Sequence, residues 1–296
     1  MNALTPLESL YDLERSAECR DVSLPPVLAT LYGRLLFPAY AHRPSVIGNF
    51  VTTLDGVVAF NETDHVGGGE ISGFNQHDRM VMGLLRAVAD VVIVGAGTLR
   101  SVPQHRWTAQ YVYPALADAY QELRRKMGKA EPPLNVVVTA RGELNLGLPV
   151  FQSGEVAALI VTTTLGAERI RQQRLPPSVH VSEVHGAGGL SAGAILEAVS
   201  RVRQSDMILV EGGPQLMGDF FAERCLDELF LTLAPQIAGR DENTQRPGFV
   251  SGKRFAPEHP LWGTLIGVKR GGSHLFLRYA LETAEHPEKS AKELSA

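Results

Sequence analysis

Cysteine is almost absent from this chain: Cys19 and Cys225 are the only two among 296 residues. Two cysteines are too few for a disulfide scaffold or for a zinc site built from thiolates. Long apolar runs are also missing, since none approaches the ~18 residues that a membrane-spanning helix needs. We therefore expect a protein of a reducing compartment, the cytoplasm, with no membrane partner.

An excess of basic charge is lacking as well. The 28 Lys and Arg residues are outnumbered by 32 Asp and Glu residues, for a net charge of −4, so no nucleic-acid partner is expected. The nine His residues form no His-Glu-x-x-His motif, and no Cys-x-x-Cys pair accompanies them. We expect no metal centre and no zinc-dependent deamination.

The sequence does contain a regular alternation of strand-type and helix-type segments. Strand-type apolar runs occupy residues 46–51, 91–94, 135–139, 157–163, 179–184, 207–210 and 228–233. With helical segments between them, they predict an α/β fold: a mixed, mainly parallel sheet flanked by helices. Residues 263–268 and 274–280, joined by a Gly-rich turn, predict a C-terminal β-hairpin at one edge of the sheet.

The same pattern sets the expected domain boundaries. Residues 43–282 are expected to form one domain, because no long linker divides them. Residues 1–42 precede the pattern and are expected to be partly helical, over 5–17 and 27–36, with prolines as breaks. Residues 283–296 are charged and poor in apolar side chains, which predicts a polar tail.

The stretch Met207 to Leu216 combines a buried strand, a glycine pair and a helix start. Glu211 ends the apolar run, Gly212 and Gly213 follow, and Pro214 suits the first turn of a helix. Glycines allow a tight turn and a close approach by a ligand. Free N–H groups at a helix start attract anions, so the stretch predicts a phosphate-binding turn. The alternative is a strand-to-helix turn that binds nothing.

Ligands of parallel sheets bind outside the carboxyl ends of the strands, and motifs follow several of these ends. The segments Asn49-Phe-Val-Thr-Thr-Leu-Asp-Gly56, Gly95-Ala-Gly-Thr-Leu-Arg100 and Val210-Glu-Gly-Gly-Pro214 together resemble the signature of the reductase domain of the bifunctional riboflavin-biosynthesis deaminase-reductases. That resemblance covers about residues 43 to 281. It implies a dihydrofolate-reductase-like fold, a homodimer, and NADPH-dependent reduction of a small pyrimidine-like or pterin-like substrate.

The resemblance also implies roles for individual residues. The residues it assigns to the reacting groups are Thr53, Asp55 and Glu211. The residues it assigns to the cofactor are Thr98, Thr139, Arg141, Gly212, Gly213, Gln215 and Leu216. Arg141 suits a ribose 2′-phosphate because a guanidinium donates two parallel hydrogen bonds. Two alternatives stay open: Asp55 is a turn former, and Arg141 is an exposed turn residue. We read Asp78 as a helix-start carboxylate.

One departure and one rival site remain. Where the family usually has a short acidic patch after Gly-x-x-Thr, this chain has Val102, with His105 and Arg106 beyond it. The missing acid puts the riboflavin-pathway substrate in doubt, so a nucleotide-binding protein without turnover is an alternative. The loop from Gly186 to Ser191 is the rival, because a glycine-rich loop between a strand and a helix also fits a Rossmann-type dehydrogenase.

Overall fold

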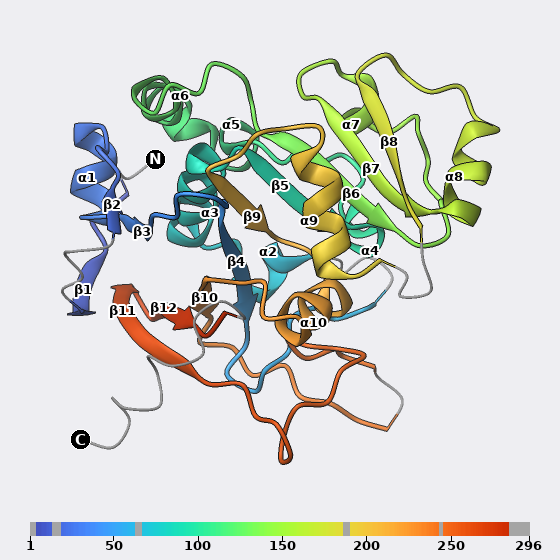
Figure 1. The fold of residues 1–296 in the computed structure, drawn as a ribbon. Coiled ribbons are helices and arrows are strands. Elements are labelled where there is room, and N and C mark those ends of the chain that lie inside the picture. The colour runs from blue at the N-terminus through green and yellow to red at the C-terminus, as the bar shows by residue number, and fades with distance from the viewer. Residues whose placement is uncertain (1–3, 14–18, 63–66, 186–189, 243–244, 284–296) are drawn as a thin grey trace.

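The computed structural model describes residues 4–13, 19–62, 67–185, 190–242 and 245–283. At its centre lies a ten-stranded sheet in the order β1-β11-β12-β10-β4-β9-β5-β6-β7-β8 (Figure 1). Its strands are β1 (Glu8–Asp12), β4 (Ser45–Thr52), β5 (Val91–Gly95), β6 (Leu134–Thr139), β7 (Ala158–Thr163), β8 (Val179–Val184), β9 (Met207–Val210), β10 (Glu228–Leu233), β11 (Gly263–Gly271) and β12 (His274–Leu281). Along the part of the sheet that runs β10-β4-β9-β5-β6-β7-β8, every pair of neighbouring strands is parallel, as predicted.

Helices cover both faces of this sheet (Figure 1). They are α1 (Pro26–Tyr32), α2 (Gly68–Ile71), α3 (Gln76–Val88), α4 (Ala96–Ser101), α5 (Ala109–Val112), a 3₁₀ turn (Pro114–Leu116), α6 (Ala117–Lys126), α7 (Pro149–Gln152), α8 (Thr164–Arg171), α9 (Ala192–Ser200) and α10 (Pro214–Ala222). Successive strand residues face opposite ways: Val92 packs in the same core as Leu84 of α3, and Ile93 packs in the same core as Phe220 of α10. We call these the α3 face and the α10 face.

The C-terminal hairpin is confirmed, and it enlarges the sheet. Strands β11 and β12 pair with one another, and β12 pairs antiparallel with β10. The fold therefore matches the prediction of a mainly parallel sheet with an antiparallel edge. No helix in the described ranges is long and apolar enough to span a membrane.

The N-terminal segment differs from the prediction in one place. Residues 5–17 were expected to be helical, but Glu8–Asp12 forms strand β1, paired antiparallel with β11. The reason is tertiary: the open edge of the hairpin offers unpaired backbone groups, and these outweigh a weak local preference. The helix expected over 27–36 is present as α1, and β3 (Leu36–Pro38) then pairs with β2 (Cys19–Asp21).

Candidate active site

Four adjacent parallel strands bring the sequence motifs to one edge of the sheet. Their order is β4-β9-β5-β6, so the segments that follow Thr52, Val210, Gly95 and Thr139 leave the sheet side by side. Motifs that are far apart in the chain therefore meet at the carboxyl edge, as the placement rule for open α/β sheets predicts.

The Gly-Gly-Pro turn lies at the centre of this edge. Gly213 is the N-cap of α10, with no side chain capping the helix, and Pro214 is in its first turn. A Cβ on Gly213 would lie 3.4 Å from Thr98 Oγ1 of α4, so two of the predicted cofactor residues are neighbours. The uncapped N–H groups of α10 make this turn a suitable anion site.

Gly212, Leu216 and Gln215 differ in what they can offer a ligand. A Cβ on Gly212 would lie 2.2 Å from Leu216 Cδ2, so close packing by Leu216 explains the glycine. Leu216 is itself buried in the α10-face core. Among Gly212, Gln215 and Leu216, only Gln215 is exposed.

Thr53 and Asp55 form a closed hydrogen-bonded turn after β4. The fully buried Thr53 donates its hydroxyl to Asp55 Oδ1 at 2.6 Å and accepts from Val57 N at 2.9 Å. Asp55 also accepts from Ala238 N at 3.1 Å and from Gly239 N at 2.7 Å. These bonds, first of all the one from Thr53, hold the pKa of Asp55 well below its usual range. Asp55 therefore ties two loops together at the site, which is the turn-forming role left open above.

Glu211 lies on the α3 face in a buried ion pair with Arg86 of α3. Arg86 donates to Glu211 Oε2 from Nη2 at 2.7 Å and from Nε at 2.9 Å. The side chains are only 3% and 6% exposed, respectively. Asn49 Nδ2 of β4 donates to Glu211 Oε1 at 3.2 Å. A carboxylate oxygen has two lone pairs, so Oε1 retains capacity for a further donor such as a ring N–H.

A second buried carboxyl group, Asp78, lies on the same face. It was expected only as a helix-start residue, and Asn75 does cap α3 by accepting from His77 N and Asp78 N. Asp78 is only 5% exposed, however, with Ser72 and Thr232 as hydrogen-bonding neighbours. Burial raises its pKa above the usual value, because the charged form loses its hydration.

The end of β6 carries the predicted 2′-phosphate residues, and they differ in exposure. Thr139 is buried and accepts from Gly142 N at 3.1 Å through its hydroxyl. Arg141 is 74% exposed, and its Nε lies 3.6 Å from Glu143 Oε2. Both residues lie at the carboxyl edge of the sheet. The Thr139 hydroxyl already accepts a hydrogen bond within its own turn, and the Arg141 guanidinium is largely solvated. Neither arrangement is specific for a phosphate.

The rival glycine-rich loop is only partly visible, because Gly186 to Gly189 lie outside the described residues. The start of α9 is described, and an internal carboxylate occupies it. Glu223 accepts from Ala192 N at 3.1 Å and from Gly193 N at 2.9 Å, while Ser191 caps Ala194 N at 3.2 Å. A pyrophosphate at this helix start would have to displace Glu223, which disfavours the Rossmann alternative.

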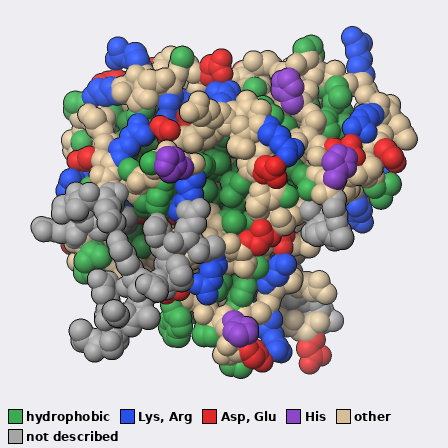
Figure 2. Space-filling model, in the orientation of Figure 1, with side chains coloured by type: hydrophobic (Ala, Val, Ile, Leu, Met, Phe, Trp, Pro, Cys, Tyr) green, Lys and Arg blue, Asp and Glu red, His purple; other side chains and the backbone are tan. Residues whose placement is uncertain are grey.

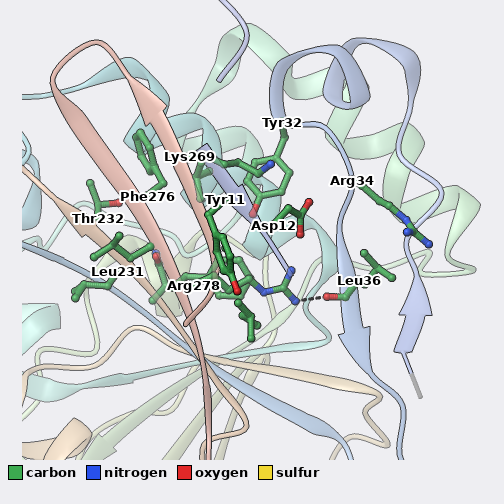
Figure 3. Close-up of a pocket in the computed structure, with 16 residues that line it drawn as sticks. Tyr11, Asp12, Tyr32, Arg34, Leu36, Leu231, Thr232, Lys269, Phe276 and Arg278 are labelled. Atoms are coloured by element: carbon green, nitrogen blue, oxygen red, sulfur yellow. Dashed lines mark hydrogen bonds between the residues drawn. The ribbon is translucent and has the colours of Figure 1, made fainter. Parts of the chain in front are cut away.

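A pocket of about 530 Å³, its open mouth included, lies between the N-terminal segment and the hairpin (Figure 3). Asn49 and Thr232 line it and also contact Glu211 and Asp78, so it lies beside the candidate site. Its Arg278 is already paired with Glu228 at 2.6 Å. None of the residues predicted for catalysis or cofactor binding lines this pocket. On the face shown in Figure 2, acidic and basic side chains are interspersed.

Sequence reasoning missed three site residues: Arg86, His105 as a partner of Arg86, and Asp78 as a buried acid. Arg86 lies in helix α3, in a segment for which the sequence suggested no functional residue. The signal that could have found it is that apolar residues surround most sides of this helix, since a buried arginine requires a carboxylate partner.

The matches to known proteins agree with this geometry. The model of the RibD C-terminal domain family matches residues 44–258. A 2,5-diamino-6-ribosylamino-4(3H)-pyrimidinone 5′-phosphate reductase of Archaeoglobus fulgidus is 28% identical over 205 residues, which cover 68% of this chain and 85% of that protein.

Solved structures show the same fold. A pyrimidine reductase-like protein of Corynebacterium diphtheriae superposes with a TM-score of 0.64 at 19% identity, covering 88% of this chain and 96% of that one. RibD of Acinetobacter baumannii superposes with a TM-score of 0.61 at 18% identity over 81% of this chain, which spans 58% of the length of that RibD chain. The chain belongs to the RibD C-terminal domain family.

Proposed function

We propose that this protein is an NADPH-dependent reductase acting on a small pyrimidine of the riboflavin pathway. The observation that carries the proposal is the meeting of an uncapped glycine turn and two buried carboxyl groups at one edge of the sheet. The name of the archaeal relative supports a ribosylamino-pyrimidine 5′-phosphate as the substrate class. A protein that binds nucleotide without turnover would have little use for an ion-paired carboxyl group beside a second buried one whose pKa is raised.

The glycine turn fits a dinucleotide. Gly213 leaves the N–H groups at the start of α10 free for a pyrophosphate, and Thr98 lies beside it. We place the nearby Gly212, Gln215 and Leu216 along the same path, with Thr139 and Arg141 toward the ribose. When bound, NADPH supplies the hydride; the protein supplies binding, orientation and electrostatics.

The two carboxyl groups suit different tasks at the substrate. Glu211, in its ion pair with Arg86, would accept a hydrogen bond from an N–H of the heterocycle. Asp78, whose burial favours the protonated form, would hold a proton that the reduced substrate requires. Thr53 and Asp55 would shape the floor of the site through their closed turn. An ion-paired carboxyl group beside a buried carboxyl group with a raised pKa is typical of acid–base sites.

NADPH binding tests the cofactor site. Gly213→Val should weaken NADPH at least about 10-fold in calorimetry, because its methyl groups would enter the anion-binding turn. Gly193→Val at the start of α9 is the matched control, since a Cβ there also has a 3.4 Å clearance, to Glu223 Oε2. Unchanged affinity in a folded Gly213→Val protein would reject this site. A selective loss in Gly193→Val would favour the rival loop.

Assembly and location are proposed on weaker grounds. The family resemblance supports a homodimer, which light scattering at micromolar concentration can test, with a monomer as the contrary result. The two cysteines, Cys19 and Cys225, form no disulfide, which supports the expected cytoplasmic location.

A further inference from the structure

The loop after α4 is the part of the site where the sequence departs from the family pattern. Val102 stands where an acidic residue was expected, and it ends α4 as its C-cap residue. The next polar side chain of this loop that reaches a site residue is His105. Its Nε2 lies 2.8 Å from Arg86 Nη1, so the loop meets the Arg86–Glu211 pair through an imidazole.

The structure holds this loop firmly. Trp107 is 2% exposed, and its backbone N–H donates to Asn135 Oδ1 of β6 at 2.9 Å. Asn135 Nδ2 returns a bond to Trp107 O at 3.3 Å. The His105 ring packs against Trp107 at 5.1 Å and against Tyr111 at 4.6 Å between ring centroids. The imidazole is therefore anchored to a central strand.

The chemistry of the contact fixes the state of the ring. Arginine has donors only, so His105 Nε2 must accept and its N–H must be on Nδ1. The ring is neutral: burial, and then the charge of Arg86, lowers its pKa to about 2. His105 thus offers Arg86 a permanent acceptor over the working range of pH.

Arg86 joins this imidazole to Glu211. Its Nε and Nη2 both donate to Glu211 Oε2, while Nη1 donates to His105 and lies 3.5 Å from Thr108 O. The guanidinium is planar and rigid. An acceptor that holds Nη1 in place therefore also holds Nε and Nη2, the two atoms that donate to Glu211. Without His105, Nη1 would retain only the longer contact to Thr108 O at 3.5 Å, so the guanidinium would be held less firmly against its carboxylate.

We propose that His105 is a positioning residue of this site: through Arg86 it sets where the Glu211 carboxylate points. The inference rests on the proposed function, in which that carboxylate accepts a hydrogen bond from the substrate. It assigns to a neutral imidazole, anchored on β6, the task of connecting the loop after α4 to the substrate side of the site.

Three variants test the proposal by NADPH oxidation with a ribosylamino-pyrimidine phosphate. His105→Leu removes the acceptor and should lower kcat about 10-fold, the scale of a lost hydrogen bond to a charged group, with KM for NADPH unchanged. His105→Gln keeps an acceptor at similar reach and should restore most of the rate. His180→Leu, at an exposed position on β8, is the control and should behave as wild type. The pH profile of kcat above pH 5 should be the same for wild type and His105→Gln.

A second readout separates this inference from the proposed function. In a ¹H–¹⁵N spectrum, the Arg86 Nε–H signal should shift and exchange faster in His105→Leu, and stay at the wild-type position in His105→Gln. An unmoved Arg86 signal in folded His105→Leu would overturn the positioning role, as would equal losses of kcat in the Leu and Gln variants. If wild-type protein oxidises no NADPH, the proposed function fails, and the Arg86 signal still decides the role of His105.

Discussion

The two sides of the candidate site bury a carboxyl group in opposite ways. On the β9 side, Glu211 is neutralised by Arg86 at 2.7 Å and receives a further bond from Asn49. On the β10 side, Asp78 has hydroxyl neighbours, and burial raises its pKa. A buried acid can be kept charged by a partner or made neutral by protonation. In the proposed function, this difference would give the site a hydrogen-bond acceptor on the β9 side and a proton donor on the β10 side.

Removing the partner from the β9 side should produce the largest effect. Arg86→Ala leaves Glu211 buried without a counter-charge, so the free energy of unfolding should fall by about 3–5 kcal/mol. Urea denaturation measures it. The control is Arg201→Ala in α9, whose pair with Glu197 joins side chains that are 64% and 65% exposed and should contribute less than about 1 kcal/mol. Equal losses in both variants would mean that Glu211 is not truly desolvated.

The second-largest effect should be a loss of catalytic rate when Asp78, the carboxyl group on the β10 side, is replaced. Asp78→Asn removes the proton, so kcat should fall about 100-fold, the lower end of the range for general acids. Steady-state NADPH oxidation measures it, and Asp118→Asn in α6, a helix-start acid, is the control. A rate within about twofold of wild type would remove Asp78 from the chemistry.

The raised pKa of Asp78 should also make the free energy of unfolding depend on pH. Its folded-state pKa lies above the ordinary value of 3.8 that it has in the unfolded chain, so its stabilising contribution is fully present below that value. The contribution is lost as pH rises through the folded-state pKa. Wild type should therefore lose more stability than Asp78→Asn when urea unfolding is compared at pH 4 and pH 8. A parallel change in both proteins would contradict the raised pKa.

The smallest effect should come from Arg141, the exposed residue that follows β6 and is proposed to contact the cofactor ribose. Arg141 is 74% exposed, so a contact with a 2′-phosphate would contribute only about 0.5–1 kcal/mol, or a two- to fivefold preference for NADPH over NADH. Arg141→Ala should remove that preference and leave NADH affinity unchanged in calorimetry. Equal weakening of both cofactors would assign Arg141 to the pyrophosphate or to the fold.

The parallel core could be predicted because its signal is local. Val91 to Val94 and Val136 to Val138 are apolar runs covered on both faces, and such runs indicate central strands without any knowledge of their neighbours. Strand β1 could not be predicted. All five of its residues are exposed, and its partner strand is β11, which is some 250 residues away in the chain and pairs with it through the backbone and through the Glu8–Arg270 ion pair.

Site residues that directly follow a strand could be predicted from the sequence. Their hydrogen-bonding and ion-pair partners, which come from distant parts of the chain, could not. Glu211 and Gly213 follow β9 directly, and their position was visible in the sequence. The partner of Glu211 is Arg86, 125 residues away, and burial, beside Thr232 of β10, raises the pKa of Asp78. Pairings at such separations arise from topology, so a single sequence shows the acids and not their environments.

The central claim is that the two carboxyl groups serve the reduction of a pyrimidine by NADPH. Its most direct test is the absorbance of NADPH after addition of 2,5-diamino-6-ribosylamino-4(3H)-pyrimidinone 5′-phosphate, the compound in the name of the archaeal relative, to wild-type protein. We predict stoichiometric oxidation of NADPH to NADP⁺ with one reduced pyrimidine formed per cofactor. NADPH that binds to the protein but stays unoxidised in the presence of that pyrimidine would contradict the account.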